Sequence, residues 1–363
     1  MIVFCHLLND SSGSPRVLRS TLQACDGYTD RLLYIGSQGR GVLEEACVPT
    51  RRYWYHRSKF RIITLFNYLA SQVFLYRSLS RAKDIPTDAT VFVNTLLPFG
   101  AMLWGWRSGR EVIVHIHEVS ISPKLLRYCL IGFASYFADK LLYVSQDHLA
   151  RLPIFGPPAE IIFNPVDPIL KARAEKVLYS PRKSGAFEVI MLASLRGYKG
   201  IEEFIALARA LRKRDDIHFT LVLNADPDEI VAFNDLNPTN DNLTVYSRTN
   251  NPSIFYVRAD LLVNLSRTDQ WIETFGLTIV EAMTFGVPVI VPPVGGPAEI
   301  VSHGVQGYCI DSRDSSIVEA AILELADNQD RAISMSENAR IHARKFSFDI
   351  YARKLRSYLL SYK

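Results

Sequence analysis

The sequence predicts an α/β protein with two doubly wound domains, each built on a parallel sheet. Short apolar runs alternate with longer amphipathic segments along the chain, as they do in consecutive strand–helix–strand units. The length of 363 residues is too great for one ordinary core and suits two α/β domains of middling size. Hydrophobic residues make up 48% and charged residues 21% of the chain, which favours a packed globular fold over disorder.

The first half of the chain contains the apolar runs that we expect to form the first sheet: IVFCHLL, RLLYIG, TVFVN, EVIVHIHE, KLLYVS and EIIFN. The stretch after them, VLYSPRKSGAFE, contains Gly and Pro and has neither strand nor helix periodicity. We therefore place the first domain at residues 1–170 and an interdomain linker near 171–185.

A second series of apolar runs predicts another doubly wound domain at residues 186–345: EVIMLASL, HFTLVLN, LTVYS, ADLLVNLS and PVIVPP. A C-terminal helix at about 346–363 is expected to pack back on the first domain. Open α/β sheets bind ligands beyond the carboxyl ends of their strands. We therefore expect the two domains to face a central cleft at those ends.

Several classes of protein do not fit the sequence. The cysteines lie far apart, without the paired spacing of a zinc site or the density of a disulfide-stapled domain. The N-terminal run MIVFCHLL lacks the basic leader and the small-residue cleavage site of a signal peptide. We expect a cytoplasmic protein without a transmembrane helix. A net charge of only +4, with no recognised nucleic-acid motif, predicts no nucleic-acid partner.

One segment is strongly basic. Residues 51–83 contain eight Lys or Arg and no Asp or Glu, interleaved with eight Phe, Tyr or Trp. On a helix, this mixture suits the anionic surface of a membrane, here the inner face of the cytoplasmic membrane. It suits equally well a helix whose aromatic residues lie in the core and whose arginines are solvated. Both interpretations stay open at the level of sequence.

The most informative segment is WIETFGLTIVEAMTFGVPVIVPPVGGPAEIV, residues 271–301. Glu273 lies just before a predicted helix, and Glu281 lies eight positions further on. A helix N-terminus presents unpaired N–H groups and a positive dipole end, so an anionic diphosphate can dock there. The docking turn is expected to consist of Phe275, Gly276, Leu277 and Thr278.

Two carboxylates beside a docked diphosphate could accept hydrogen bonds from a sugar on one flank and a ribose on the other. Glu273 and Glu281 are the candidates. The alternative is that Glu273 only caps the helix and that Glu281 is solvated. The surroundings favour the binding role: a buried-looking strand precedes the segment, and a small-residue helix, a second strand and the turn Gly295–Gly296 follow.

From Ser266 to Glu299, as SRTDQWIETFGLTIVEAMTFGVPVIVPPVGGPAE, the chain resembles the donor-binding signature of retaining family-4 glycosyltransferases. These enzymes have the GT-B fold of two Rossmann-like domains. The segments ADLLVNLS, FNPVD and FSFDIYARKL also fall in register with that family. The resemblance covers most of the chain, strongly in the second domain and loosely in the first.

The resemblance implies that a basic pair in the first strand-to-helix turn of the second domain holds the donor phosphates. That turn reads ASLRGYKGIEEF, in which Lys199 and Gly200 match the family's Lys-Gly pair. Ser194 stands where the family usually has arginine, and Arg196 is the candidate substitute. A lysine provides the point charge that a diphosphate needs.

In the first domain, DSSGSPRV resembles the family's glycine-containing loop on the acceptor side, with Gly13 and Ser14 at its centre. His117 and Glu118 occupy the place of the family's His-Asp pair near the reacting sugar. His115 lies on the same strand face and is the residue most easily confused with His117, as a core histidine.

No metal and no cofactor are expected. Asp226-Pro227-Asp228 has the spacing with which another class of glycosyltransferase holds a divalent metal, but it also suits a turn after HFTLVLN. The turn is the favoured interpretation, since a helix dipole and Lys199 can neutralise the diphosphate.

The resemblance therefore implies a metal-independent retaining glycosyltransferase that moves a sugar from a nucleotide-diphosphate sugar to a saccharide or lipid-linked saccharide of the cell envelope. Glu273, His117 and Lys199 are its implied catalytic residues. The alternatives are a GT-B sugar-nucleotide epimerase or phosphorylase, which needs no membrane acceptor, and a non-catalytic nucleotide-sugar-binding module. The complete set of Glu273, Glu281 and Lys199 disfavours the binding module.

Overall fold

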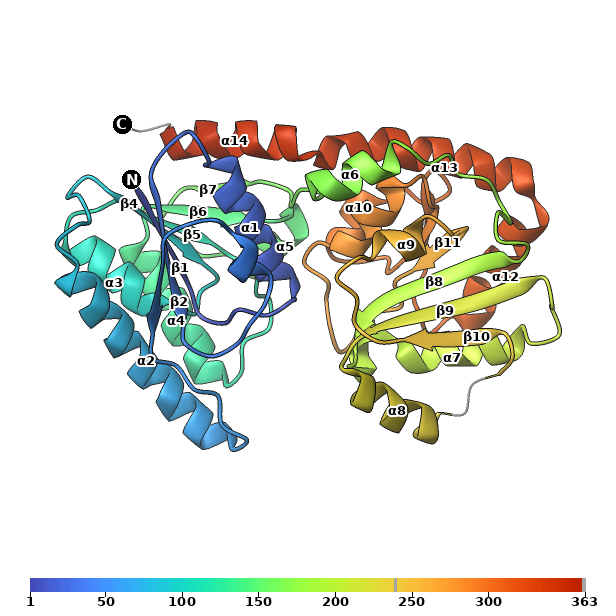
Figure 1. The fold of residues 1–363 in the computed structure, drawn as a ribbon, viewed down its shortest axis with the longest axis horizontal. Helices are drawn as coiled ribbons and strands as arrows, with labels where there is room; N and C mark the ends of the chain where they lie inside the picture. Colours follow the sequence, from blue (N-terminus) through green and yellow to red (C-terminus); the bar gives the residue numbers. More distant parts are fainter. Residues whose placement is uncertain (238–239, 361–363) are drawn as a thin grey trace. The chain divides into compact units, whose positions relative to one another are not determined.

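The computed structural model describes residues 1–237 and 240–360 of the chain. It divides into two compact units. Unit 1 comprises Met1–Pro165 and the C-terminal segment from Phe348, and unit 2 comprises Val166–Ser347. Each unit contains one parallel sheet with helices on it (Figure 1). The predicted fold class of two doubly wound α/β domains is confirmed.

The sheet of unit 1 has the strand order β3-β2-β1-β4-β5-β6-β7, and every neighbouring pair is parallel. Its strands are β1 (Ile2–His6), β2 (Arg31–Gly36), β3 (Thr50–Tyr53), β4 (Thr90–Asn94), β5 (Val112–His115), β6 (Lys140–Tyr143) and β7 (Ala159–Ile161). The order reverses direction between β1 and β4, which is where doubly wound sheets place their ligands.

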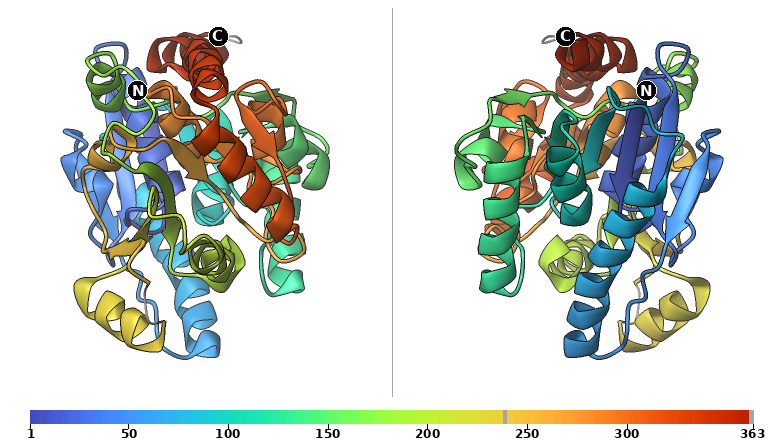
Figure 2. Two further views of the ribbon diagram at one scale, coloured as in Figure 1. Left: turned by 90° about the vertical axis from the view of Figure 1, so that its right-hand side faces the viewer. Right: turned by 90° about the vertical axis from the view of Figure 1, so that its left-hand side faces the viewer.

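Helices cover both faces of this sheet. One face packs against α2 (Arg61–Arg81), α3 (Phe99–Arg107) and α4 (Lys124–Phe137), which lie side by side (Figure 2). The other face packs against α1 (Gly13–Ala24) and α14 (Phe348–Leu360). The Tyr351 hydroxyl on α14 lies 2.7 Å from the Thr21 hydroxyl on α1, so the C-terminal helix belongs to the core of unit 1.

The sheet of unit 2 has the order β10-β9-β8-β11-β12-β13 and is also parallel throughout. Its strands are β8 (Phe187–Ser194), β9 (Ile217–Asn224), β10 (Leu243–Tyr246), β11 (Leu261–Val263), β12 (Val289–Val291) and β13 (Gly307–Cys309). Its helices are α6 (Pro168–Ala174), α7 (Ile201–Ala210), α8 (Pro227–Leu236), α9 (Ser253–Tyr256), α10 (Leu277–Thr284), α11 (Gly296–Ile300), α12 (Ser315–Asp327) and α13 (Gln329–Ala343).

The boundary between the units differs from the expected one. The chain passes from unit 1 to unit 2 at Pro165, not after residue 170, and the expected linker at 171–185 begins inside α6. The side chain of Asp167 accepts a hydrogen bond from the N–H of Ile169 at 2.7 Å, and Pro168 occupies the first helical turn. This cap starts a helix where the sequence suggested irregular structure.

Within the described residues, no helix is both long enough and apolar enough to cross a membrane.

Candidate active site

Lys199 lies in a tight turn at the carboxyl end of β8. The strand is followed by the 3-10 turn η2 (Gly197–Lys199), and Gly200 then adopts φ 80° before α7 begins. A Cβ atom on Gly200 would lie 2.0 Å from the carbonyl oxygen of Leu265. Only glycine fits this combination of positive φ and close backbone approach. The N–H of Arg267 donates to the Tyr198 carbonyl at 2.9 Å, so the turn is fixed to the chain segment after β11.

Two glycines fix the backbone that bears Glu273. The N–H of Gly296 donates to the carbonyl oxygen of Glu273 at 2.9 Å. A Cβ atom at Gly295 would lie 2.5 Å from that same oxygen, and one at Gly296 would lie 2.4 Å from the carbonyl of Thr274. The double-glycine turn that leads into α11 therefore permits two backbone segments to touch, and it sets the position of Glu273.

The structure brings Lys199 and Glu273 together. The Lys199 Nζ lies 2.5 Å from Glu273 Oε2, and the two side chains are only 17% and 19% exposed. The same ammonium lies 5.2 Å from the ring centre of Trp271, which stacks on Tyr198 at 5.0 Å. An ammonium between a carboxylate and an aromatic face is both paired and oriented. Lys199 is thus not an ordinary solvated lysine, and Glu273 is not the helix cap.

The helix after Glu273 begins where the sequence indicates. Gly276 is its N-cap with φ 98°, and α10 begins at Leu277. The carbonyl of Gly276 accepts from the N–H groups of Ile279 and Val280, which are the first bonds of the helix. Thr278 lies in the first turn, and Phe275 is buried with its ring edge against Phe346.

Glu281 is buried on α10 with 2% of its surface exposed. The hydroxyl of Tyr256, at the end of α9, donates to its Oε2 at 2.7 Å. Burial of a carboxylate needs compensating hydrogen bonds, so the alternative that Glu281 is a solvated surface residue is wrong.

Arg196 and Ser194 differ in their exposure. Arg196 is exposed, and its guanidinium has no side-chain partner within residues 1–237 and 240–360. Ser194 ends β8 and is half-buried. The backbone of Arg196 is part of the turn, because its carbonyl accepts from the N–H of Lys199 at 3.0 Å.

Unit 1 forms a second cluster, at the carboxyl ends of β1, β4 and β5. The Nε2 of His117 lies 3.0 Å from Oδ1 of Asn94, the last residue of β4. The amide of Asn94 donates in turn to the carbonyl of Ser14 at 3.2 Å. Asn94 therefore links His117 to the start of α1. Gly13 and Ser14 form the first turn of that helix, whereas the sequence suggested a loop. Pro15 fits there because the N–H groups of a first helical turn make no hydrogen bond within the helix, so the N–H that proline lacks is not needed.

Burial controls the charges in this cluster. Burial lowers the pKa of His117 well below its usual value, and the neighbouring His115, His148 and His6 lower that pKa further. The Nε2 of His117 must carry the proton that Asn94 Oδ1 accepts, which leaves Nδ1 as the acceptor nitrogen. Burial raises the pKa of Glu118, whose carboxylate accepts from the N–H of Leu96 at 3.1 Å.

His115 is the core histidine of the pair. It is fully buried, and neither of its ring nitrogens has a hydrogen-bond partner among the residues that the structure describes. Its burial lowers its pKa to about 3. His117 is half-buried and lies beyond the end of β5. Ser145 caps α5 (Gln146–Arg151) by accepting from the N–H of His148 at 3.1 Å, which is a structural role.

Asp226 is the N-cap residue of α8, and its N–H donates to Glu229 at 2.8 Å. Its carboxylate pairs with Arg248. Asp226-Pro227-Asp228 therefore starts a helix. Within the described residues, no group of three or more His, Cys, Asp or Glu could hold a metal ion.

Sequence reasoning missed the residues that hold the candidate site in place: Tyr198, Trp271, Tyr256, Asn94 and Thr95. Thr95 follows β4 with φ 75°, a strained value for a β-branched residue and a feature that clusters at functional sites. No motif marks these positions. The one available signal is that Trp271 and Tyr198 are large aromatic residues within the two segments that bear Glu273 and Lys199.

Comparison with known proteins agrees with this geometry. Residues 177–342 match the family model of the glycosyl transferases group 1. A D-inositol 3-phosphate glycosyltransferase of Corynebacterium kroppenstedtii is 40% identical over 83 residues, which are 23% of this chain and 18% of that protein. The same enzyme of Corynebacterium efficiens is 24% identical over 252 residues, 61% of this chain and 56% of that protein. The chain thus spans less than two thirds of the length of either relative.

The fold has close structural counterparts. The crystal structure of Anabaena Alr3699/HepE in complex with UDP and glucose superimposes with a TM-score of 0.78 at 19% identity, covering 99% of this chain and 100% of that one. The chain therefore has the GT-B fold of two Rossmann-like domains, and the match to the glycosyl transferases group 1 lies in its second unit.

Proposed function

We propose that this protein is a retaining glycosyltransferase that takes a sugar from a nucleotide-diphosphate donor. The observation that carries the proposal is the half-buried Lys199–Glu273 pair beside the N-terminus of α10, inside the region that matches the glycosyl transferases group 1. The relatives support it: the structure of HepE holds UDP and glucose, and the two Corynebacterium relatives are named as glycosyltransferases.

The donor diphosphate would lie on the turn Phe275–Thr278, where helix N–H groups and the positive dipole end face it. Lys199 would turn from Glu273 towards the phosphates, with Arg196 as a second cation. Glu273 would then be released to accept from a sugar hydroxyl, and Glu281 would accept from the ribose. Stabilising the departing diphosphate is the main catalytic contribution of such a site.

Retention of configuration is proposed to follow from attack on the same face as the leaving diphosphate, which takes the proton of the acceptor. His117 would orient a sugar hydroxyl as a neutral imidazole, since burial lowers its pKa well below the usual value. No metal or cofactor is needed in this scheme, since the cations and the helix dipole neutralise the diphosphate.

Donor binding tests the proposal first. Thermal stabilisation and slow donor hydrolysis would be measured in EDTA with UDP-, GDP- and dTDP-sugars. Glu281→Ala is the test variant, and Glu337→Ala, which removes an exposed carboxylate from α13, is its control. We expect one donor class to stabilise the wild type and the control but not Glu281→Ala. Stabilisation of all three proteins alike, or of none, would refute the assigned site.

The acceptor is proposed to be a cell-envelope polysaccharide or a lipid-linked oligosaccharide, reached from the inner face of the cytoplasmic membrane through residues 51–83. Residues 51–83 contain both buried and exposed aromatic and apolar side chains. Tyr53, Tyr55 and Tyr68 are buried. Large apolar side chains on the outer face of α2 and just before it are exposed: Trp54, Phe60, Ile62, Ile63, Phe66, Leu69, Val73 and Phe74.

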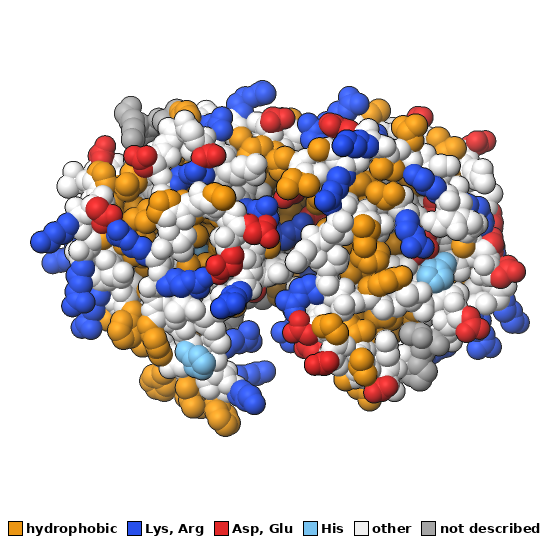
Figure 3. All heavy atoms as spheres, viewed as in Figure 1, with side chains coloured by type: hydrophobic (Ala, Val, Ile, Leu, Met, Phe, Trp, Pro, Cys, Tyr) orange, Lys and Arg blue, Asp and Glu red, His pale blue; other side chains and the backbone are white. Residues whose placement is uncertain are grey.

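Hydrophobic side chains gather at the end of α2 that begins at Arg61, with Lys and Arg beside them (Figure 3). Phe66 is 68% and Ile62 is 72% exposed. A helix with such a face lies in the plane of a membrane interface. We expect the protein to float with anionic vesicles, and Ile62→Ser with Phe66→Ser to abolish flotation. Ile333→Ser, an exposed change on α13, is the control. Failure of the wild type to float would remove the membrane from this proposal.

A further inference from the structure

A groove of about 720 Å³ lies in unit 1 between the edge strand β3 and the last two turns of α2. Trp54 and Phe74 form its apolar wall, with ring centres 5.4 Å apart. The groove has the size of an ordinary small-molecule site. Neither His117 nor any residue assigned above to the donor lines it.

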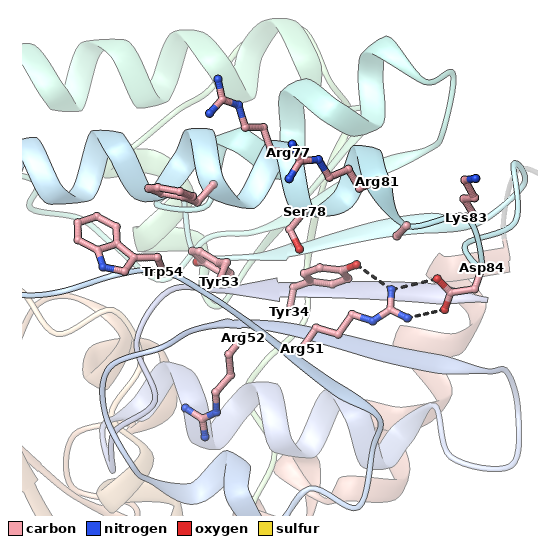
Figure 4. Close-up of a pocket in the computed structure, with 12 residues that line it drawn as sticks. Tyr34, Arg51, Arg52, Tyr53, Trp54, Arg77, Ser78, Arg81, Lys83 and Asp84 are labelled. Atoms are coloured by element: carbon pink, nitrogen blue, oxygen red, sulfur yellow. Dashed lines mark hydrogen bonds and ion pairs between the residues drawn. The ribbon is translucent and has the colours of Figure 1, made fainter.

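Five cations and one carboxylate line the groove: Arg51, Arg52, Arg77, Arg81, Lys83 and Asp84. Two of the cations are already paired. Arg51 donates to Asp84 through both of its terminal nitrogens, at 3.1 and 2.6 Å, and to the Tyr34 hydroxyl at 3.0 Å (Figure 4). Arg52 pairs with Glu44. The carboxylate of Asp84 is therefore used by Arg51.

The other three cations have no hydrogen-bond or ion-pair partner in the part of the chain that the structure describes. Arg77 and Arg81 extend from α2, and Lys83 follows the helix (Figure 4). Arg77 and Arg81 are one helical turn apart, and like charges at that spacing repel each other. The hydroxyl-bearing Ser78 lies between them and also lines the groove. An anion in the groove would remove this repulsion.

We propose that this groove is a binding site for a phosphate group, in which Arg77, Arg81 and Lys83 hold the charge and the Trp54–Phe74 wall packs on the apolar part of the ligand. Guanidinium groups suit phosphate because their parallel N–H donors match its oxygens. A single carboxylate would leave part of the threefold charge uncompensated. A phosphate with up to two negative charges matches it better.

The phosphate could come from a lipid headgroup or from a phosphorylated saccharide. The same helix bears the exposed apolar face at its first turns, so a membrane that contacts this face would bring headgroups to the groove. To this extent the inference deepens the proposed membrane contact and rests on it. It does not depend on donor transfer, because the donor residues belong to unit 2.

The test compares two variants that each remove three positive charges. Arg77→Gln, Arg81→Gln and Lys83→Gln together empty the groove of its unpaired cations. Arg209→Gln, Arg212→Gln and Lys213→Gln change exposed residues at the end of α7 and in the turn after it, in unit 2. Both sets alter exposed side chains, so thermal melting should be unchanged. Binding is measured with phosphatidylcholine vesicles, with and without phosphatidylglycerol, and separately with soluble tripolyphosphate.

We expect the groove variant to lose about tenfold or more in affinity, since each cation near an anionic surface contributes measurably to binding. The unit 2 variant should keep wild-type affinity. Loss in the vesicle experiment identifies a headgroup as the source, and loss with tripolyphosphate alone identifies a soluble phosphate. Equal loss in both variants, or no loss in either, would overturn the inference.

Donor stabilisation is measured in the same variants. The groove variant should bind the nucleotide sugar like the wild type. Absence of donor binding in every protein, with groove-dependent phosphate binding intact, would contradict the proposed function and leave this site standing.

Discussion

The ion pair between Lys199 and Glu273 joins the two side chains to which the proposed chemistry assigns opposite tasks, one at the diphosphate and one at the sugar. Their separation of 2.5 Å makes each the main partner of the other. In the proposed mechanism, a bound donor must separate the two side chains. Their mutual attraction therefore opposes donor binding slightly, while it holds both side chains in place until a donor binds.

This coupling predicts non-additive kinetics. We expect Lys199→Gln and Glu273→Gln each to lower kcat/KM by about 10²-fold, in line with the loss of one electrostatic donor at a developing charge. The double variant should be far less impaired than the product of the two losses, because each single change already disables the pair. Steady-state kinetics of the four proteins measure the coupling.

Arg196→Gln is the matched comparison, because Arg196 is exposed and has no side-chain partner among the described residues. We expect a rise in the donor KM of several-fold with kcat nearly unchanged. A loss as large as that of Lys199→Gln would mean that Arg196, and not Lys199, is the principal phosphate ligand.

At the scale of elements, the turn between β8 and α7 depends on one glycine. Gly200 has φ 80°, and an added Cβ would meet the Leu265 carbonyl at 2.0 Å. Gly200→Ala must therefore move the turn that bears Lys199, and we expect it to lower the free energy of unfolding by about 1–3 kcal/mol and to impair turnover further. Gly197, in the same turn, has open space around its Cα. Gly197→Ala should leave both the melting temperature and the turnover unchanged.

The docking of α14 on unit 1 gives a second prediction at this scale. Tyr351 is 2% exposed, and its ring packs among residues of α1 and the sheet. Tyr351→Ala should cost about 3–5 kcal/mol of unfolding free energy, as large aromatic truncations in cores do. Tyr351→Phe loses only the hydrogen bond to Thr21, worth about 1 kcal/mol. Denaturant unfolding of each variant measures its loss of unfolding free energy and so distinguishes the two costs. A cost for Tyr351→Ala no greater than that for Tyr351→Phe would show that the helix is dispensable.

Most strands could be predicted from the sequence, because parallel strands buried on both faces are continuous apolar runs. The exception in unit 1 is β3, whose residues Thr50–Tyr53 read TRRY. It is an edge strand with one buried residue, so it lacks the apolar run. In unit 2, β13 (Gly307–Cys309) is also an edge strand and is only three residues long.

The candidate site was predictable only in part, for a related reason. Lys199 and Glu273 stand in local motifs that can be read along the chain. Their support comes from contacts between distant segments, such as Gly295 against the Glu273 carbonyl and Asn94 beside His117. A pattern of nearby residues contains no information about which distant backbone will approach.

At the scale of the whole molecule, we expect the two units to respond in opposite directions to acid, although the lowered pKa of His342 partly offsets the response of unit 2. In unit 1, the pKa values of His6, His115, His117 and His148 are all lowered, by burial above all. A histidine with a lowered folded-state pKa stabilises the fold above its unfolded pKa of about 6.5, and this contribution is lost as the pH falls below that value. For His115, whose folded-state pKa is about 3, the cost one pH unit lower is about 1.4 kcal/mol. The raised pKa of Glu118 offsets part of this.

In unit 2, Asp260 acts in the other direction. Its carboxylate accepts from the N–H groups of Arg182 and Glu188 at 3.0 and 2.7 Å, and burial raises its pKa to about 7. A carboxyl with a raised folded-state pKa stabilises the fold below its unfolded pKa, and that contribution is lost as the pH rises through 7. Acidification from pH 7.5 to about 5.5 should therefore weaken unit 1 and strengthen unit 2.

Hydrogen exchange of β5 and β8, followed by mass spectrometry and corrected for intrinsic rates, reports the opening free energy of each unit separately. We expect exchange in β5 to quicken and exchange in β8 to slow between pH 7.5 and 5.5. Within the described chain, neither ring nitrogen of His115 has a hydrogen-bond partner, so His115→Leu should be tolerated and should reduce the acid sensitivity of β5. His56→Gln, an exposed change in the same unit, should not. Equal acid sensitivity in both units, or in both variants, would mean that the buried histidines of unit 1 become exposed to solvent by local opening before they are protonated.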